Sequence, residues 1–177
     1  IPSGMDPTIE IAGRVLAAGT VFAIMAAWEV FAPRRPLVAG RLQRWPSNLG
    51  IVVVDALLVR LLIPTGVIGA SLYAAGHSIG LFHFLNLRLS VAALVGFLVL
   101  DLVIYVQHVV FHHVPWLWRL HRMHHADLDI DVTTGVGFHP LEILLSLAIK
   151  MAAVVALGAP AAAVLIFEVL LNATAMF

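Results

Sequence analysis

Five histidines of this sequence fall into two groups whose spacing suits a metal site, His108-x-x-x-His112 and His121-x-x-His124-His125. Imidazole is the commonest protein ligand for metal ions. Side chains three or four residues apart share one face of a helix, so each group can present two ring nitrogens to one ion. Adjacent side chains on a helix point about 100° apart, which favours different ions for His124 and His125. The pattern therefore predicts a metal centre with two ions.

Other polar residues near these groups are interpreted differently. Three aspartates alternate along the chain after the second group, at Asp127, Asp129 and Asp131. They lack the glycine and the distant glutamate of a calcium-binding loop, so we expect a solvated acidic loop. The histidines outside the motifs are not expected to bind metal: His77, His83 and His113.

The composition is that of an integral membrane protein. Hydrophobic residues make up 62% of the 177 positions, only 11% are charged, and the mean hydropathy is +1.02. A formal net charge of zero argues against nucleic acid as a partner, because phosphates require a concentrated basic face. The chain has no cysteine, which excludes disulfides, thiolate catalysis and iron–sulfur clusters. A bound metal must therefore use histidine, carboxylate or water.

Apolar segments of membrane-spanning length predict how the chain crosses the bilayer. Five such segments cover approximately residues 9–32, 49–70, 87–111, 141–157 and 161–176. The loop 33–48 holds four of the ten Lys and Arg residues, so we expect it in the cytoplasm, and residues 71–86 form a short outer connection or interfacial segment. The predicted fold is all-α: a polytopic membrane helical bundle of four to five membrane helices, one domain over residues 1–177. The histidines then lie on the cytoplasmic face.

Several ionisable residues lie inside the predicted spans. Asp55 and Arg60 are five residues apart, so they either pair loosely or face a polar interior. Asp101 and Tyr105 precede the first histidine group at intervals that place all four side chains on one helical face. We therefore expect Asp101 and Tyr105 to support the metal ligands.

The residues from Asp101 to His125, followed by Thr133-Thr134 and the string Phe-His-Pro-Leu-Glu over residues 138–142, resemble the fatty acid hydroxylase/sterol desaturase superfamily. The resemblance implies a membrane-bound non-haem di-iron oxygenase. Such an enzyme uses O₂ and an external electron donor to hydroxylate or desaturate a C–H bond of a lipid, either fatty acyl or sterol. Glu142 is expected to hydrogen-bond a ligand imidazole. The implied ligands of two iron ions are His108, His112, His121, His124 and His125, with His139 as a further candidate.

The resemblance also implies partners, a location and a missing part. The partners are a lipid substrate, the membrane and an electron-donor protein such as cytochrome b5 or ferredoxin. The location is a bacterial inner membrane, or the endoplasmic reticulum if the source is eukaryotic. Asn172 and Phe177 match the start of the family's next element, Asn-x-x-x-x-Phe-x-His, and no third His-x-x-His-His group follows. We therefore interpret the chain as truncated at its C-terminus and expect this stretch alone to be inactive.

Other classes of membrane protein are compatible with histidine-rich sequences. A metal transporter would coordinate its ions near the bilayer midplane on broken helices, whereas this cluster begins at the end of a span. A haem cytochrome needs two histidine pairs on facing spans, and only one span carries a pair. A structural membrane protein would bind no metal. The transporter, or another metal-binding membrane protein, is the main alternative.

Overall fold

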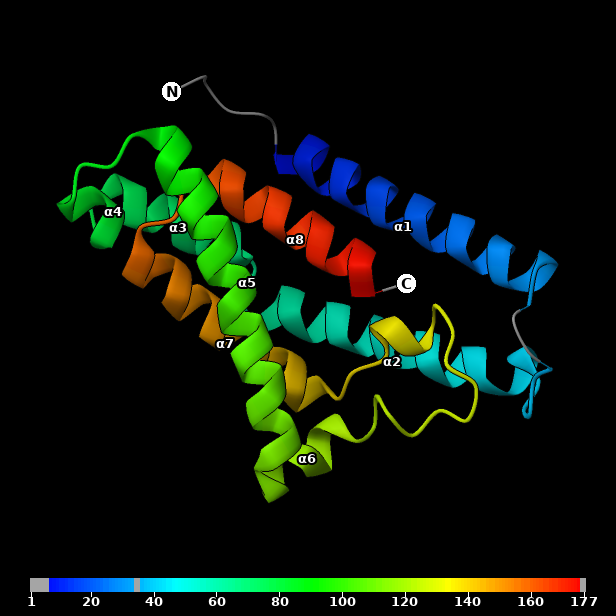
Figure 1. The fold of residues 1–177 in the computed structure, drawn as a ribbon. Coiled ribbons are helices and arrows are strands. Elements are labelled where there is room, and N and C mark those ends of the chain that lie inside the picture. Colours follow the sequence, from blue (N-terminus) through cyan, green and yellow to red (C-terminus); the bar gives the residue numbers. More distant parts are fainter. Residues whose placement is uncertain (1–6, 34–35, 176–177) are drawn as a thin grey trace.

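The computed structural model describes residues 7–33 and 36–175, and over this range the chain is a bundle of helices (Figure 1). No strand occurs among the described residues. The all-α fold class expected from the sequence is confirmed. The elements are α1 (Pro7–Phe31), α2 (Arg41–Leu62), α3 (Gly66–Gly76), α4 (Leu81–Phe84), α5 (Leu89–His113), α6 (Pro115–His121), the short 3₁₀ helix η1 (Thr134–Val136), α7 (Pro140–Leu157) and α8 (Ala161–Ala175).

Long apolar helices make this a membrane protein. Within the described residues, three stretches are long and apolar enough to cross a membrane, namely Arg41–Phe84, Leu89–His113 and Pro140–Leu157. Gly19–Phe31 and Ala161–Ala175 are shorter apolar helices. At 1.5 Å per residue, α8 is about 22 Å long, which is less than the roughly 30 Å of a hydrocarbon core.

The second predicted span is two helices. The chain leaves α2 at Leu62, and Ile63 adopts φ −137° and ψ 67° before Pro64. A residue that precedes proline is disfavoured in the helical region, and proline has no N–H to continue the hydrogen-bond ladder. The helix therefore breaks, and α3 packs against α7 and α8. The prediction that residues 71–86 form an outer connection or interfacial segment was wrong for residues 71–76, because α3 runs to Gly76 and belongs to the core.

The predicted loop 33–48 is also shorter than expected, because α2 begins at Arg41 and includes Pro46. Proline inside a helix removes one hydrogen bond, which made this stretch look like a loop from sequence. The first turns of α2 are held by tertiary contacts instead. Arg44 in particular is buried and bonded to residues more than eighty positions later in the chain.

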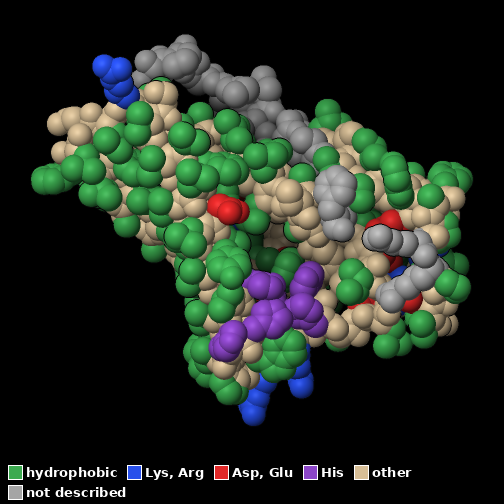
Figure 2. All heavy atoms as spheres, in the orientation of Figure 1, with side chains coloured by type: hydrophobic (Ala, Val, Ile, Leu, Met, Phe, Trp, Pro, Cys, Tyr) green, Lys and Arg blue, Asp and Glu red, His purple; other side chains and the backbone are tan. Residues whose placement is uncertain are grey.

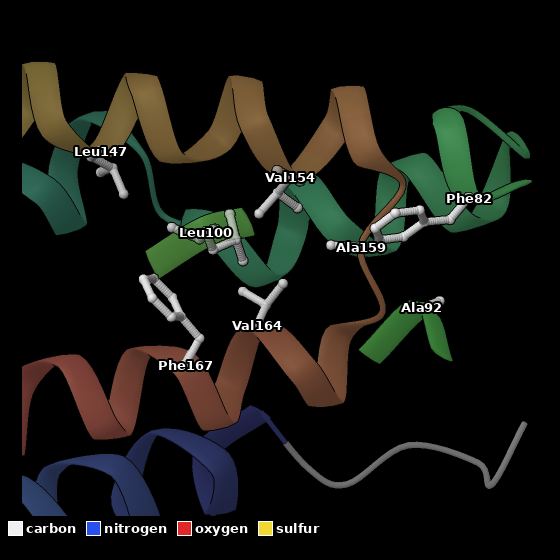
Figure 3. Close-up of a cluster of buried hydrophobic side chains, with 10 residues drawn as sticks. Phe82, Ala92, Leu100, Leu147, Val154, Ala159, Val164 and Phe167 are labelled. Carbon is white, nitrogen blue, oxygen red and sulfur yellow. The ribbon is translucent and has the colours of Figure 1, made fainter. Parts of the chain in front are cut away.

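The hydrophobic core lies where α3, α5, α7 and α8 meet (Figure 3). Its centre contains Leu100, Val154, Val164 and Phe167. The predicted turn between α7 and α8 is present: Gly158 has φ 68°, a left-handed conformation that glycine adopts without strain. The α3–α4 connection approaches this turn so closely that a Cβ on Gly80 would lie 2.2 Å from the Gly158 nitrogen. Each of α7 and α8 packs on α3 and α5.

Candidate metal centre

A reversal of the chain after α5 brings the two histidine groups together. Val114 is extended, as expected for a residue that precedes proline, and Pro115 then begins α6. Because of this reversal α6 packs back on α5, so the group at the end of α6 faces the group at the end of α5. Trp118 fills the space between them, with its ring centroid 5.2 Å from that of His112 and 5.7 Å from that of His125.

Four of the predicted ligands converge on one point. The Nε2 atoms of His108 and His112 are 3.1 Å apart, and those of His121 and His125 are 3.2 Å apart. One ring nitrogen from each of the four lies within 4.8 Å of every other. We call this set the four-histidine group. Figure 2 shows the histidines gathered at the edge of a hollow in the surface.

The spacing of these nitrogens fits a metal ion. An ion bound by imidazole at about 2.0–2.1 Å in a tetrahedral arrangement holds its ligand nitrogens about 3.3 Å apart. The two measured pairs are within about 0.2 Å of that value. Imidazole suits iron, zinc, copper and nickel, so the donor set limits the choice of metal without selecting one. The group can therefore hold one ion with small adjustments of side chains.

Glu142 fixes the orientation of one of these imidazoles, as the sequence predicted. Its Oε1 accepts a hydrogen bond from Nδ1 of His121 at 2.6 Å, and both side chains are buried. A proton on Nδ1 leaves the Nε2 lone pair free for a metal. Burial, with the neighbouring His125 and His112, lowers the pKa of His121 to about 4. His121 is therefore neutral at physiological pH, as a ligand must be.

His124 and His139 lie outside the four-histidine group. The ring of His124 stacks on Phe138 at 4.4 Å, and its Nδ1 is buried without a hydrogen-bond partner. Burial, followed by the proximity of His125 and His121, lowers the pKa of His124 to about 4. His139 caps α7, because its Nδ1 accepts a hydrogen bond from the Leu141 N–H at 3.2 Å. Whether these two bind a second ion remains a prediction.

A cavity of about 670 Å³ extends from the histidines into the bundle. Helices α5, α7 and α8 provide most of its wall, and His108, His124 and Glu142 line it near the metal centre. Asp101 and Tyr105 line the same cavity one to two turns before His108. They share the face predicted from their spacing, but they lie outside the four-histidine group. Most of the other lining residues are apolar or aromatic.

In the acidic segment, residues 127–134, Asp129 and Asp131 are buried and Asp127 is half-buried, so the expectation of a solvated acidic loop was wrong. Arg44 donates to both oxygens of Asp127 at 2.9 Å and to Asp131 at 2.7 Å. Asp129 accepts hydrogen bonds from the backbone of Val38 and Ala39. A buried charge must be paired, and the partners come from the other end of the sequence.

These contacts tie the loop after the histidines to the helices that begin the chain. Burial alone would raise the pKa of the Asp131 carboxyl, but hydrogen bonds from Thr133, Trp45 and Arg44 hold it below its usual value of 3.8. Asn48 bridges Asp127 and Thr133 at 3.0 Å each. The sequence analysis missed the role of Asn48. It counted Arg44 only among the cationic residues of the loop 33–48 and did not predict its ion pairs.

The two ionisable residues of the second predicted span do not pair. Arg60 is exposed and donates only a long hydrogen bond, 3.4 Å, to the Pro64 carbonyl. Asp55 is buried, and neither of its carboxylate oxygens has a hydrogen-bond partner. The predicted pair with Arg60 is therefore not formed, and a polar interior around Asp55 stays a prediction.

We expect Glu142→Gln to weaken the metal centre without removing a ligand. The amide still fills the space of the carboxylate but no longer presents an anionic acceptor to His121. Outer partners of this kind typically contribute 10- to 100-fold to metal affinity or activity. Metal content should be measured by mass spectrometry after dialysis against a graded series of chelator concentrations. An affinity equal to that of the unmodified protein would contradict this role for Glu142.

Comparison with known protein families and structures adds one finding about the matched region. The family model described as fatty acid hydroxylase matches residues 93–177. No curated protein and no solved structure matches the chain. The matched range begins in α5 and contains the four-histidine group, His124, His139 and Glu142. The resemblance noted from the sequence motifs is therefore confirmed.

Proposed function

We propose that the protein is a membrane-bound non-haem iron oxygenase acting on a lipid, because residues 93–177 match the fatty acid hydroxylase family model. Its reaction would be the hydroxylation or desaturation of an unactivated C–H bond. The observation that carries the proposal is the convergence of the four-histidine group at the mouth of a largely apolar cavity. An apolar substrate in that cavity would have its near end beside the metal.

Each part of the site has a role in this reaction. Iron bound to the histidines would supply the oxidising power, drawing on O₂ and on electrons from a donor. The four-histidine group provides ring nitrogens from the end of α5, from α6 and from the turn after α6, and Glu142 keeps His121 in the correct tautomer. Phe111 and Phe138 line the cavity beside His108 and His124 and keep water away from the reacting end.

A second iron ion is part of the proposal. The buried, unpartnered Nδ1 of His124 supports it, because such an atom is costly unless something binds it. His139 lies on the segment before Glu142, where its ring nitrogen now caps α7. Two imidazoles are too few for an iron site, so further donors would have to complete the second position.

The electron donor should dock beside the histidines. Arg119 and Arg122 are exposed and flank His121, which gives this end of the molecule a basic character; Figure 2 shows Lys and Arg side chains directly next to the histidines. An acidic protein such as cytochrome b5 or ferredoxin would match this charge. The rate of electron transfer should then fall as ionic strength rises, and a rate independent of salt would contradict this docking.

The proposal is tested by metal analysis and turnover of the purified protein. After iron-replete expression, we expect stoichiometric non-haem iron and no haem spectrum. With a reductant and O₂ supplied, a mixture of membrane lipids should yield a hydroxylated or desaturated product detectable by mass spectrometry. A haem spectrum, or the absence of iron after iron-replete expression, would overturn the oxygenase proposal and favour one of the alternatives.

The proposed topology has the metal centre in the cytoplasm, on the same side as the start of α2. The chain lacks cysteine, so single cysteines can be introduced without background. Leu42 and Ile130 are 91% and 77% exposed at the histidine end, and Leu85 is exposed at the opposite end of α5. In intact cells, a membrane-impermeant thiol reagent should label Leu85→Cys but neither Leu42→Cys nor Ile130→Cys.

Lysed cells supply the control for this labelling, because all three cysteines should then react. If Leu42→Cys and Ile130→Cys behaved differently from each other in intact cells, the two loops would not share a side. If both were labelled while Leu85→Cys was protected, the orientation would be reversed.

A further inference from the structure

A half-buried ion pair lies on the wall of the cavity, away from the metal centre. Lys150 of α7 and Glu168 of α8 are 3.2 Å apart, and each side chain is only 16% exposed. Both residues line the cavity. Lys150 is the eleventh residue of α7, a candidate membrane span, so it lies about 15 Å along that helix from its start.

Charges at this depth are expensive and usually mark a substrate or ion pathway. The pair is not needed to complete the hydrophobic core, whose residues lie elsewhere on α7 and α8. Two cavity-lining residues nearby form a second polar contact, since the Gln107 amide donates to the Ser146 hydroxyl at 2.5 Å. Glu142, Ser146 and Lys150 follow one another at intervals of four on the same side of α7. A polar stripe therefore runs from the metal centre to the ion pair.

We propose that Lys150 and Glu168 bind a neutral oxygen-bearing group of the lipid, a hydroxyl or a carbonyl, while another carbon of the same lipid lies at the histidines. This inference rests on the proposed oxygenase function and specifies its substrate class. Glu142 and Lys150 are eight residues apart, so the polar group would lie about 12 Å along α7 from the oxidised carbon. The cavity volume of about 670 Å³ is that of a site for one drug-sized or lipid-sized molecule.

The charge balance of the pair decides which polar group it would accept. Glu168 lies 3.2 Å from Lys150, so a carboxylate bound to the Lys150 ammonium would also meet the like charge of Glu168. An anionic fatty acid would also have to be desolvated near the middle of the membrane. A hydroxyl can accept from the Lys150 ammonium and donate to the Glu168 carboxylate without adding charge. The pair therefore favours an alcohol over the corresponding acid and over a plain hydrocarbon.

Binding can be measured without turnover, so the test does not depend on the proposed chemistry. The purified protein in lipid nanodiscs is photo-crosslinked with a diazirine-bearing hexadecanol. Unlabelled hexadecanol, hexadecane and palmitate, which share a sixteen-carbon chain, serve as competitors. We expect hexadecanol to compete about tenfold better than hexadecane, the effect of one hydrogen bond to charged groups, and palmitate to compete least. The crosslinked peptide should come from α7 or α8.

The decisive variant is Lys150→Met/Glu168→Leu, which removes both members of the ion pair together. The advantage of hexadecanol over hexadecane should then disappear. If the double variant fails to fold, a reversed pair, Lys150→Glu/Glu168→Lys, serves in its place. It retains both charged groups and should keep the advantage of hexadecanol over hexadecane. Thr174→Val, a change at an exposed α8 residue that bonds only its own helix, is the matched control and should behave as the unmodified protein.

The outcomes separate this inference from the oxygenase function. If the double variant keeps the preference for the alcohol, or if palmitate competes best, the pair only joins α7 to α8 and the inference is wrong. If lipids are oxidised with no preference for the alcohol, the function stands and the inference fails. If the alcohol preference depends on the pair but the purified protein contains no iron, the inference stands and the oxygenase function fails.

Discussion

His112→Ala should remove bound iron and reduce turnover to background, whereas His113→Ala should leave both unchanged. The two residues are adjacent on the last turn of α5 and both are exposed, so neither change disturbs the core. Their side chains point in different directions. The Nε2 of His112 faces His108 within the four-histidine group, while Nδ1 of His113 lies 2.7 Å from the Val109 carbonyl of its own helix. Removing one of four converging ligands opens the ion to water and weakens its retention.

Iron content by mass spectrometry and product formation from the same purified sample are the two measurements. Similar melting curves for the two metal-free variants would show that any difference arises at the metal. Equal loss of iron in both variants would mean that the end of α5 as a whole, rather than the four-histidine group, holds the metal. Full iron retention by His112→Ala would exclude His112 as a ligand.

Arg44→Met should destabilise the protein by about 3–5 kcal/mol, the usual cost of removing one partner from a buried ion pair. Two carboxylates, Asp127 and Asp131, would lose their cation while remaining buried. The acidic segment follows the second histidine group directly, so its release should also loosen His121 and His125. Chemical denaturation in detergent, followed by circular dichroism, measures the free energy of unfolding. Iron retention in the same samples reports on the metal centre.

The effect should depend on pH in a defined direction. The folded-state pKa values of Asp127 and Asp131 lie below the usual value of 3.8, so these groups stabilise the fold above that pH and lose this contribution as the pH falls through their folded-state values. The difference between the unmodified protein and Arg44→Met should therefore be largest near neutral pH and shrink in acid. Arg60→Met, on the same helix, should change stability by less than about 0.5 kcal/mol, because Arg60 is exposed and makes one long hydrogen bond. If Arg60→Met lost as much stability as Arg44→Met, the ion pairs of Arg44 would not be the cause of the loss.

Features that depend on neighbouring residues were predictable from the sequence. The apolar stretches and the low charge content determine a helical membrane protein, because backbone groups in lipid must be satisfied within each segment. The spacing of His108 and His112, and of His121 and His125, determines two imidazole pairs, because residues four apart share a helix face. The turn at Gly158 followed from the sequence Gly-Ala-Pro over residues 158–160, and the family motifs linked Glu142 to a ligand imidazole before its contact with His121 was known.

Features that depend on residues far apart in the chain were decided only by the tertiary structure. The sequence of the acidic segment does not indicate that Arg44, 83 residues before Asp127, is its partner. Without a known cation, three aspartates in a row of alternating positions are expected to be solvated. The break at Pro64 was hidden because the residues on both sides are equally apolar, and only packing of α3 on α7 and α8 shows that the second half belongs to the core. Lys150 and Glu168 look like isolated charges in two separate spans. They form a pair because α7 and α8 both pack on α5, which brings the two side chains within 3.2 Å of each other. An unpaired charge in lipid would cost much more free energy than a paired one.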